Sequence, residues 1–199
     1  MPDSSSRPHD FRTRRQITDS RVLAAMSHPL RRRLLDALAL DGAATASALA
    51  DATGQAVGNV SHHLKVLAAA DLIEEAPELA RDRRERWWRE VSESYQWSSE
   101  DFQDDPASEA IAQAALSLNL DRQFDHVRRW YAAPDDERTA WGKGPFSVSW
   151  WLKLTPDELG ELSRELVELF ERWDERKDRD DGNVREPVFV FANGAPGRP

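Results

Sequence analysis

The sequence of 199 residues contains no cysteine, which excludes several kinds of chemistry at once. Without thiols the chain forms no disulfide, binds no metal through thiolates and carries no thiol redox centre. Catalytic signatures are missing too: there is no GxSxG, no HExxH and no glycine-rich phosphate loop. We therefore expect a protein that is not an enzyme and that has neither a cofactor nor a metal site.

Extended apolar stretches are also missing from the chain. No segment approaches the ~20 apolar residues that cross a bilayer, and the first residues (MPDSSSRPHDFRTRRQ) lack the apolar core of a signal peptide. We expect residues 1–17 to form a disordered arm. We also expect a cytoplasmic protein without a membrane partner.

The net charge of −9 is unevenly distributed along the chain. Residues 1–100 hold 14 Lys and Arg against 15 Asp and Glu, whereas residues 101–199 hold 13 against 21. In the first half the arginines are concentrated, with eight in residues 1–35 and five in residues 81–89. Such basic patches can bind phosphate while the acidic half faces away. The overall acidity therefore does not exclude a nucleic-acid partner.

The first half is typical of short helices followed by two short strands. Thr18 or Asp19 can cap a first helix, Pro29 can begin a second and Thr45 can cap a third. The predicted helices end near Met26, at Asp41-Gly42, at Thr53-Gly54 and, for a fourth that begins near residue 56, near Ala70. The predicted strands are residues 72–74 and 86–91, joined by a charged loop.

Residues 45–70 carry the most informative pattern, because two short helices flank a turn with a glycine, as in a helix-turn-helix. On a helical wheel the second helix has one narrow apolar stripe, which we expect to face inward: Val57, Val60, Leu64 and Leu67. The opposite face and its flanks hold small and hydrogen-bonding side chains: Gly58, Asn59, Ser61, His62, His63, Lys65 and Val66. Asn can pair with adenine, Ser with donors or acceptors, and Lys with guanine or phosphate. We predict that this helix reads DNA in the major groove.

The two strands after this helix are expected to form a wing. Four arginines lie at its tip and on its second strand: Arg81, Arg83, Arg84 and Arg86. They would contact the DNA backbone or the minor groove, which positions a domain without specifying sequence. Of Trp87 and Trp88, one should pack inward and the other remain partly exposed. The fold predicted for residues 18–92 is a winged helix-turn-helix.

Three segments of this domain resemble the ArsR-like (arsenical-resistance-repressor) family of winged helix-turn-helix regulators. They are AAMSHPLRRRLLDAL (24–38), ALADATGQAVGNVSHHLKVLAAADLIEE (48–75) and RDRRERWWRE (81–90). The resemblance implies a homodimer that binds a palindromic operator in double-stranded DNA, as a repressor relieved by an inducer. It also implies a set of base-reading positions: Val57, Gly58, Asn59, Ser61 and His62. Many family members sense metals through cysteine pairs, and this chain has none.

The second half is expected to be a linker, residues 93–105, followed by a helical and βαβ region, residues 106–195. Predicted in order are a helix over about 106–132, a shorter one ending at Trp141-Gly142, a strand at 146–154, a helix opened by the capping box Thr155–Glu158, and a strand at 187–191. The last helix has an apolar stripe of Leu159, Leu162, Leu166, Leu169, Phe170 and Trp173. The fold class is thus α+β, mostly α, with an α/β C-terminal region for dimerisation or effector binding.

Some residues allow two interpretations. Five tryptophans of the second half suit either core and dimer packing or a pocket for a small organic effector: Trp130, Trp141, Trp150, Trp151 and Trp173. Arg31, Arg32 and Arg33 could contact phosphate or pair with acidic side chains. Two other functions also fit the sequence. The winged helix could be a scaffold in a protein-interaction module, or the tryptophan-rich half could belong to a ligand-binding protein or small enzyme.

Overall fold

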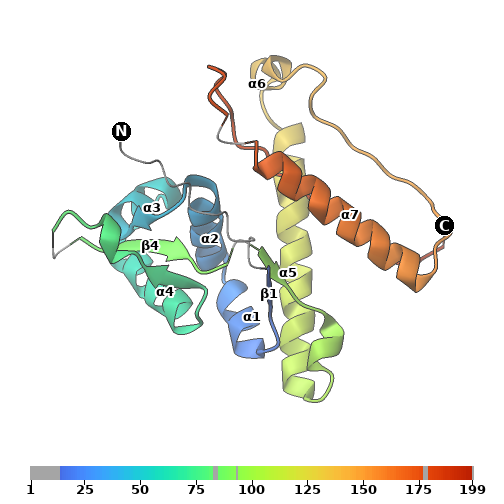
Figure 1. Ribbon diagram of the computed structural model, residues 1–199, viewed down its shortest axis with the longest axis horizontal. Coiled ribbons are helices and arrows are strands. Elements are labelled where there is room, and N and C mark those ends of the chain that lie inside the picture. The colour runs from blue at the N-terminus through green and yellow to red at the C-terminus, as the bar shows by residue number, and fades with distance from the viewer. Residues whose placement is uncertain (1–13, 83–84, 93, 177–178, 199) are drawn as a thin grey trace, which may run out of the picture. The chain divides into compact units, whose positions relative to one another are not determined.

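The computed structural model describes residues 14–82, 85–92, 94–176 and 179–198. The chain divides into two compact units, residues 1–122 and 123–199, and the boundary between them lies inside a helix. The elements of both units are labelled in Figure 1. The first unit holds the winged helix-turn-helix, and the chain as a whole is α+β and mostly α, as predicted.

Four helices between residues 20 and 69 confirm the predicted ones to within about a residue. They are α1 (Ser20–Met26), α2 (Pro29–Asp41), α3 (Ala46–Thr53) and α4 (Val57–Ala69). The Asp19 carboxylate accepts a hydrogen bond from the Arg21 amide, and the Thr45 hydroxyl accepts one from the Ala48 amide. These side chains satisfy amides that the first turn of a helix leaves without partners. Gly54 ends α3 in the left-handed conformation, with φ of 64°, which a glycine adopts without steric strain.

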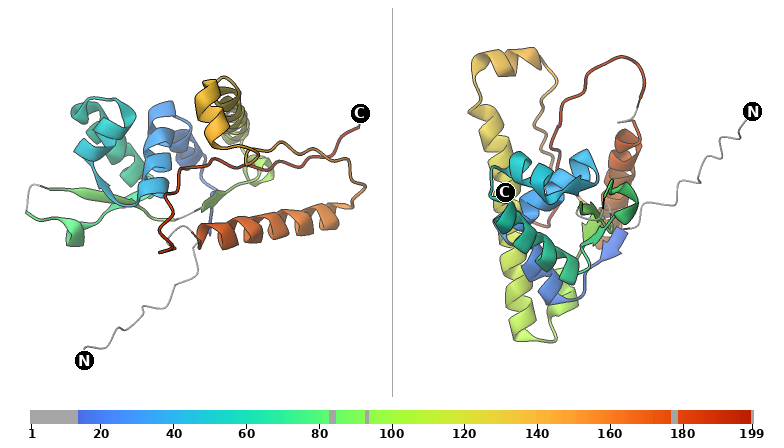
Figure 2. Two further views of the ribbon diagram at one scale, coloured as in Figure 1. Left: turned by 90° about the horizontal axis from the view of Figure 1, so that it is seen from above. Right: turned by 90° about the vertical axis from the view of Figure 1, so that its left-hand side faces the viewer.

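The wing is a three-stranded antiparallel sheet in the order β2-β4-β3. Its strands are β2 (Ala44–Thr45), β3 (Ile73–Glu75) and β4 (Trp87–Glu90), with a short 3₁₀ helix, Pro77–Leu79, between the last two. The predicted hairpin is confirmed and lies beside α3 and α4 (Figure 2). Trp88 is buried and Trp87 is half-buried, which confirms the predicted alternation.

The core of this unit lies between the four helices and the sheet. The side chains with almost no exposed surface are Ile17, Leu23, Leu34, Leu35, Leu49, Val60, Leu64, Leu67, Leu72 and Ile73. Three residues of the predicted stripe of α4 are thus fully buried, but the fourth, Val57, is 46% exposed. The prediction for Val57 is wrong because this residue begins the helix, one turn before Val60 enters the core. Val66, expected on the open face, is half-buried against the core.

Two segments expected to lack regular structure belong to the folded unit. Strand β1 (Arg14–Gln16), in the expected disordered arm, pairs in parallel with β5 (Ser94–Gln96), in the expected linker. A 3₁₀ helix, Ser99–Phe102, follows, and Phe102 is buried in the core. These elements have only three or four residues each, which is too short for an apolar period in the sequence. Residues 1–13 of the expected arm lie outside the described residues.

Helix α5 (Pro106–Tyr131) confirms the predicted long helix and begins in the first unit. Ala112 and Ala115 are buried there, and Ser108 is hydrogen-bonded to Ser20 of α1, 2.9 Å between hydroxyl oxygens. The Arg122 guanidinium lies 3.0 Å from the Asp36 carboxylate of α2. The first part of α5 is therefore packed against the helix-turn-helix domain.

The second unit contains the end of α5, α6 (Asp135–Ala140) and α7 (Pro156–Asp174). Both shorter helices were predicted, and the Thr155 and Glu158 side chains form the expected capping box at the start of α7. Among the described residues 123–176 and 179–198, none is buried. Every helix in the described part of the chain is too short or too polar to cross a bilayer.

The strands predicted at residues 146–154 and 187–191 are not formed, and so neither is the βαβ unit. Both segments are extended connections without a ladder (Figure 2). Phe189 instead stacks on His126 of α5 at 4.4 Å between ring centroids, and Phe191 contacts Phe124 edge to face at 5.7 Å. Alternating apolar side chains indicate an extended backbone, but a strand also needs hydrogen-bonding partners, which the pattern does not reveal.

Candidate nucleic-acid interface

The predicted DNA-reading residues lie together on one surface of α4. Three buried residues on the opposite side anchor this helix: Val60, Leu64 and Leu67. The exposed residues of the predicted face are Val57, Gly58, Asn59, His62 and Lys65, and Ser61 is half-buried at its edge. We name this set, Val57–Asn59 with Ser61, His62 and Lys65, the reading face. Apart from Val57 and Gly58 its side chains are polar, and it follows the turn of the helix-turn-helix.

The first turn of α4 leaves its backbone open. Its N-cap is Ala56, which offers no side-chain hydrogen bond to the amides that follow. A β-carbon built on Gly58 would meet no atom within 4 Å, so the fold itself has room for a side chain there. Because glycine in a helix costs about 1 kcal/mol relative to alanine, a residue without a side chain at this position suits close approach of a partner to the backbone.

Asn59 is held by a neighbour that the sequence analysis did not identify. Its Nδ2 donates to Oε1 of Gln55 at 3.2 Å, and Nε2 of Gln55 donates to the Gly54 carbonyl at 3.2 Å. The spacing of four residues between glutamine and asparagine is the only signal in the sequence for this contact. It was missed because Gln55 precedes the helix.

His63, next to the reading face, belongs to the interior and is only 8% exposed. Its ring lies 4.5 Å from that of His28, the N-cap of α2, whose Nδ1 accepts the Leu30 amide. Burial lowers the pKa of both histidines, with a further lowering by Arg31 at His28 and by His28 and Arg31 at His63. The lowered pKa favours the neutral form of both rings, which pack together between the start of α2 and α4.

The arginines of the wing differ in the number of carboxylates with which they form ion pairs. Arg81 is exposed, and Arg86 is also largely exposed, with one ion pair to Glu75 at 3.4 Å. Arg89, which was not among the predicted contacts, pairs with both Glu74 and Glu78. Arg83 and Arg84, predicted at the wing tip, lie outside the described residues.

The three consecutive arginines of α2 make contacts inside the domain. Arg31 donates to carbonyls at the end of α1, Arg32 pairs with Asp36 at 3.1 Å and Arg33 donates to the Thr53 carbonyl at 2.7 Å. Arg32 therefore pairs with an acidic side chain, as one of the two interpretations had it, whereas Arg31 and Arg33 contact backbone carbonyls.

The tryptophans of the second unit are mostly exposed. Trp130 lines a shallow depression with Tyr131 and Arg138, and the guanidinium of Arg176 lies 4.4 Å above the ring of Trp173. Trp150 and Trp151 are 80% and 67% exposed, and Trp141 is exposed as well. The depression thus includes one of the five proposed effector residues.

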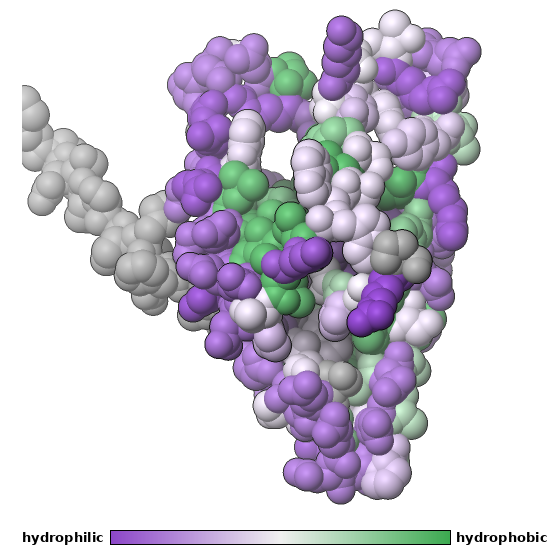
Figure 3. Space-filling view, turned by 90° about the vertical axis from the view of Figure 1, so that its right-hand side faces the viewer, coloured by the Kyte–Doolittle hydropathy of each residue, from purple (hydrophilic) through white to green (hydrophobic). Residues whose placement is uncertain are grey.

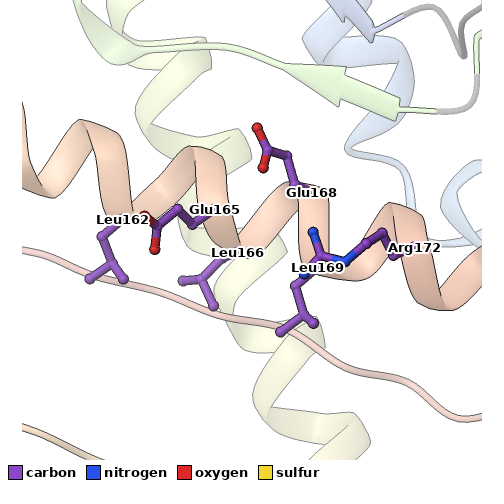
Figure 4. A pocket seen from close by; sticks show the side chains of 6 residues that line it. All are labelled: Leu162, Glu165, Leu166, Glu168, Leu169 and Arg172. Atoms are coloured by element: carbon purple, nitrogen blue, oxygen red, sulfur yellow. The ribbon is translucent and has the colours of Figure 1, made fainter.

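The apolar stripe of α7 is also open. Leu162, Leu166 and Leu169 point to one side of the helix, and together with three charged residues of α7 they line a shallow groove (Figure 4). A space-filling view shows apolar side chains exposed between strongly hydrophilic ones (Figure 3). The described residues contain no group of three or more side chains that could hold a metal ion.

Comparison with known proteins supports the helix-turn-helix. Residues 26–76, from the end of α1 to just past β3, match the family described as a helix-turn-helix domain. The chain carries a winged helix-turn-helix domain. This match covers about a quarter of the chain, and no curated protein matches.

Three solved structures are similar to the chain. NolR from Sinorhizobium fredii is 28% identical over 38% of this chain and 70% of its own, with a TM-score of 0.33. The homodimeric winged helix-turn-helix DNA-binding domain of Mb0332 from Mycobacterium bovis, a possible ArsR-family transcriptional regulator, is 25% identical over 53% of this chain and 83% of its own, with a TM-score of 0.34. The MarR family transcription regulator SP03579 is 21% identical over 79% of this chain and 81% of its own, with a TM-score of 0.32. Because these TM-scores are low, the fold assignment depends on the elements and registers described above and on the family match.

Proposed function

We propose that this protein is a sequence-specific, DNA-binding transcriptional regulator of the ArsR-like kind. The observation that carries the proposal is the asymmetry of α4, whose apolar stripe from Val60 to Leu67 is buried while its reading face is exposed. The match to the helix-turn-helix family over residues 26–76 supports the same conclusion. A helix anchored in this way can enter a major groove, which is wide enough for one α-helix.

In this proposal each part of the domain has its own task. Asn59 pairs with adenine, Ser61 and His62 donate or accept at neighbouring base edges, and Lys65 contacts guanine or phosphate. The open backbone at Gly58 allows α4 to lie deep in the groove. The wing arginines bind the phosphate backbone or the minor groove and so set the orientation of the domain: Arg81, Arg83, Arg84 and Arg86.

The regulator acts as a homodimer and a repressor in the cytoplasm. Two copies of α4 enter successive major grooves about 34 Å apart, which requires a palindromic operator. The dimer forms through α1 and the C-terminal region, and the unburied apolar stripe of α7 supports this assignment. A small organic effector, bound near the exposed tryptophans, changes the spacing of the two reading faces.

Alanine substitution on the reading face tests the proposal. Asn59→Ala, Ser61→Ala and His62→Ala are compared with Gln113→Ala, an exposed polar residue of α5, by fluorescence anisotropy with duplexes that the wild-type protein selects from a random pool. We expect each reading-face variant to weaken binding about five- to hundredfold, as for lost base contacts, with unchanged melting temperature. Unchanged binding by all three variants would contradict the proposal and favour a protein-interaction scaffold.

A further inference from the structure

Gln55 connects the end of α3 to the first turn of α4. Its backbone amide donates to the Ala50 carbonyl at 2.9 Å, which fixes the residue in the turn. Its side chain then makes two hydrogen bonds of 3.2 Å, one to the Gly54 carbonyl and one to the Asn59 side chain. The glutamine thus reaches from the turn to the residue that we assign to adenine.

The two hydrogen bonds determine which way the Asn59 amide points. A backbone carbonyl can only accept, so Gln55 must turn its NH₂ group towards Gly54 and its oxygen towards Asn59. Asn59 must then turn its own NH₂ group towards Gln55. As a result, Oδ1 and the second N–H of Asn59 remain for a ligand.

This remaining pair of groups matches one base. The major-groove edge of adenine offers an acceptor at N7 and a donor at N6, and a side-chain amide binds both with one N–H and its oxygen. Gln55 and Asn59 are both exposed, so water competes for their hydrogen bond and it contributes little to stability. It can still favour one orientation of the amide before DNA arrives, and such an orientation would reduce the entropy lost on binding.

We propose that Gln55 is a positioning residue that orients the Asn59 amide for adenine. The inference rests on the proposed function, because it requires that α4 read bases. It adds a residue outside the reading face, in the turn, to the determinants of sequence preference.

The test uses full-length protein and duplexes that differ at one base pair. The wild-type protein first selects a site from a random duplex pool, and Asn59→Ala identifies the position where preference for adenine is lost. Gln55→Met then removes both hydrogen bonds at similar side-chain length, whereas Gln55→Glu keeps an oxygen that accepts from Asn59. Dissociation constants are measured for all four bases at that position, and cooperative melting shows that each variant is folded.

We expect the wild type to prefer adenine by about five- to hundredfold and Gln55→Met to lose at least about threefold of that preference. Gln55→Glu should bind every duplex more weakly because of its negative charge, but keep the preference. In an Asn59→Ala background, Gln55→Met should change nothing further at this position.

Two results would overturn the inference while leaving the proposed function intact. One is full adenine preference in Gln55→Met. The other is a change at a different base pair that persists in the Asn59→Ala background, which would mean that Gln55 contacts a base itself. A wild-type protein that selects no sequence at all would instead overturn the proposed function, and this inference with it.

Discussion

At Gly58 the requirements of folding and of DNA binding can be measured separately, because the fold has room for a β-carbon at this position. We expect Gly58→Ala to stabilise the protein by up to about 1 kcal/mol, the difference in helix propensity. The same methyl group should weaken binding to the selected duplex, because in the proposed complex it would face the DNA. Chemical denaturation and anisotropy measured on the same sample test both effects. A variant that is more stable and binds DNA equally well would show that the backbone of α4 does not approach the duplex closely.

The paired rings of His28 and His63 make stability depend on pH. Burial lowers the pKa of both histidines in the folded protein, whereas in the unfolded chain a histidine titrates near 6.5. The unfolded chain therefore binds more protons below about pH 6.5, so the contribution to stability is complete above that pH and is lost as the pH falls. The charged or titratable groups around the pair are Arg31 of α2 and His62 of α4.

Melting temperatures measured between about pH 7.5 and pH 5 test this dependence, since the interval includes the histidine pKa of the unfolded chain. His63→Leu should flatten the dependence on pH, whatever it does to stability at neutral pH. His62→Gln, next to it but exposed, should change the dependence less than His63→Leu, because His62 is the smallest of the causes that lower the pKa of His63. An unchanged slope in His63→Leu would contradict the assignment of the pH dependence to this pair.

In the wing, Arg86 and Arg89 provide a matched pair of variants. Arg86 has one carboxylate partner at 3.4 Å, whereas Arg89 is engaged by two. If Arg86 binds phosphate, Arg86→Ala weakens binding to all sequences alike and reduces the slope of log affinity against log salt by about 1. Arg89→Ala should change the slope less. Binding isotherms at several salt concentrations test this, and a loss of preference at one base pair in Arg86→Ala would contradict a backbone contact.

The helices could be predicted from the sequence because their signals are local. Asp19, Thr45 and Thr155 cap helices where the sequence indicated. The side chain of each accepts a hydrogen bond from a backbone amide in the first turn. Strands β1 and β5 could not be predicted, because their pairing joins three-residue segments some 80 positions apart. Residues 146–154 show the reverse case, because they have the alternating apolar pattern of a strand but form no hydrogen-bonded ladder. On the interface, the reading face followed from helical spacing, whereas the role of Gln55 depends on the shape of a turn.

For the molecule as a whole, the open stripe of α7 bears on assembly. Leu162, Leu166 and Leu169 lie on one side of a helix in which no residue is buried. If this stripe forms the dimer contact, the wild-type protein is a dimer in solution and Leu166→Asp with Leu169→Asp gives a monomer, because buried charges without partners are costly. Glu161→Gln, on the polar side of α7, should remain dimeric. Sedimentation equilibrium distinguishes these outcomes, and a wild-type monomer at micromolar concentration would contradict the dimer.

Dimethyl sulfate footprinting of the selected duplex tests whether α4 enters the major groove. The reagent methylates N7 of guanine in the major groove and N3 of adenine in the minor groove, so one experiment reports on both. We expect guanine N7 to be protected in two patches centred one helical turn, about 10 base pairs, apart, and Asn59→Ala with His62→Ala to abolish both. Wild-type protein that binds the duplex tightly yet leaves every guanine N7 reactive would contradict a reading helix in that groove.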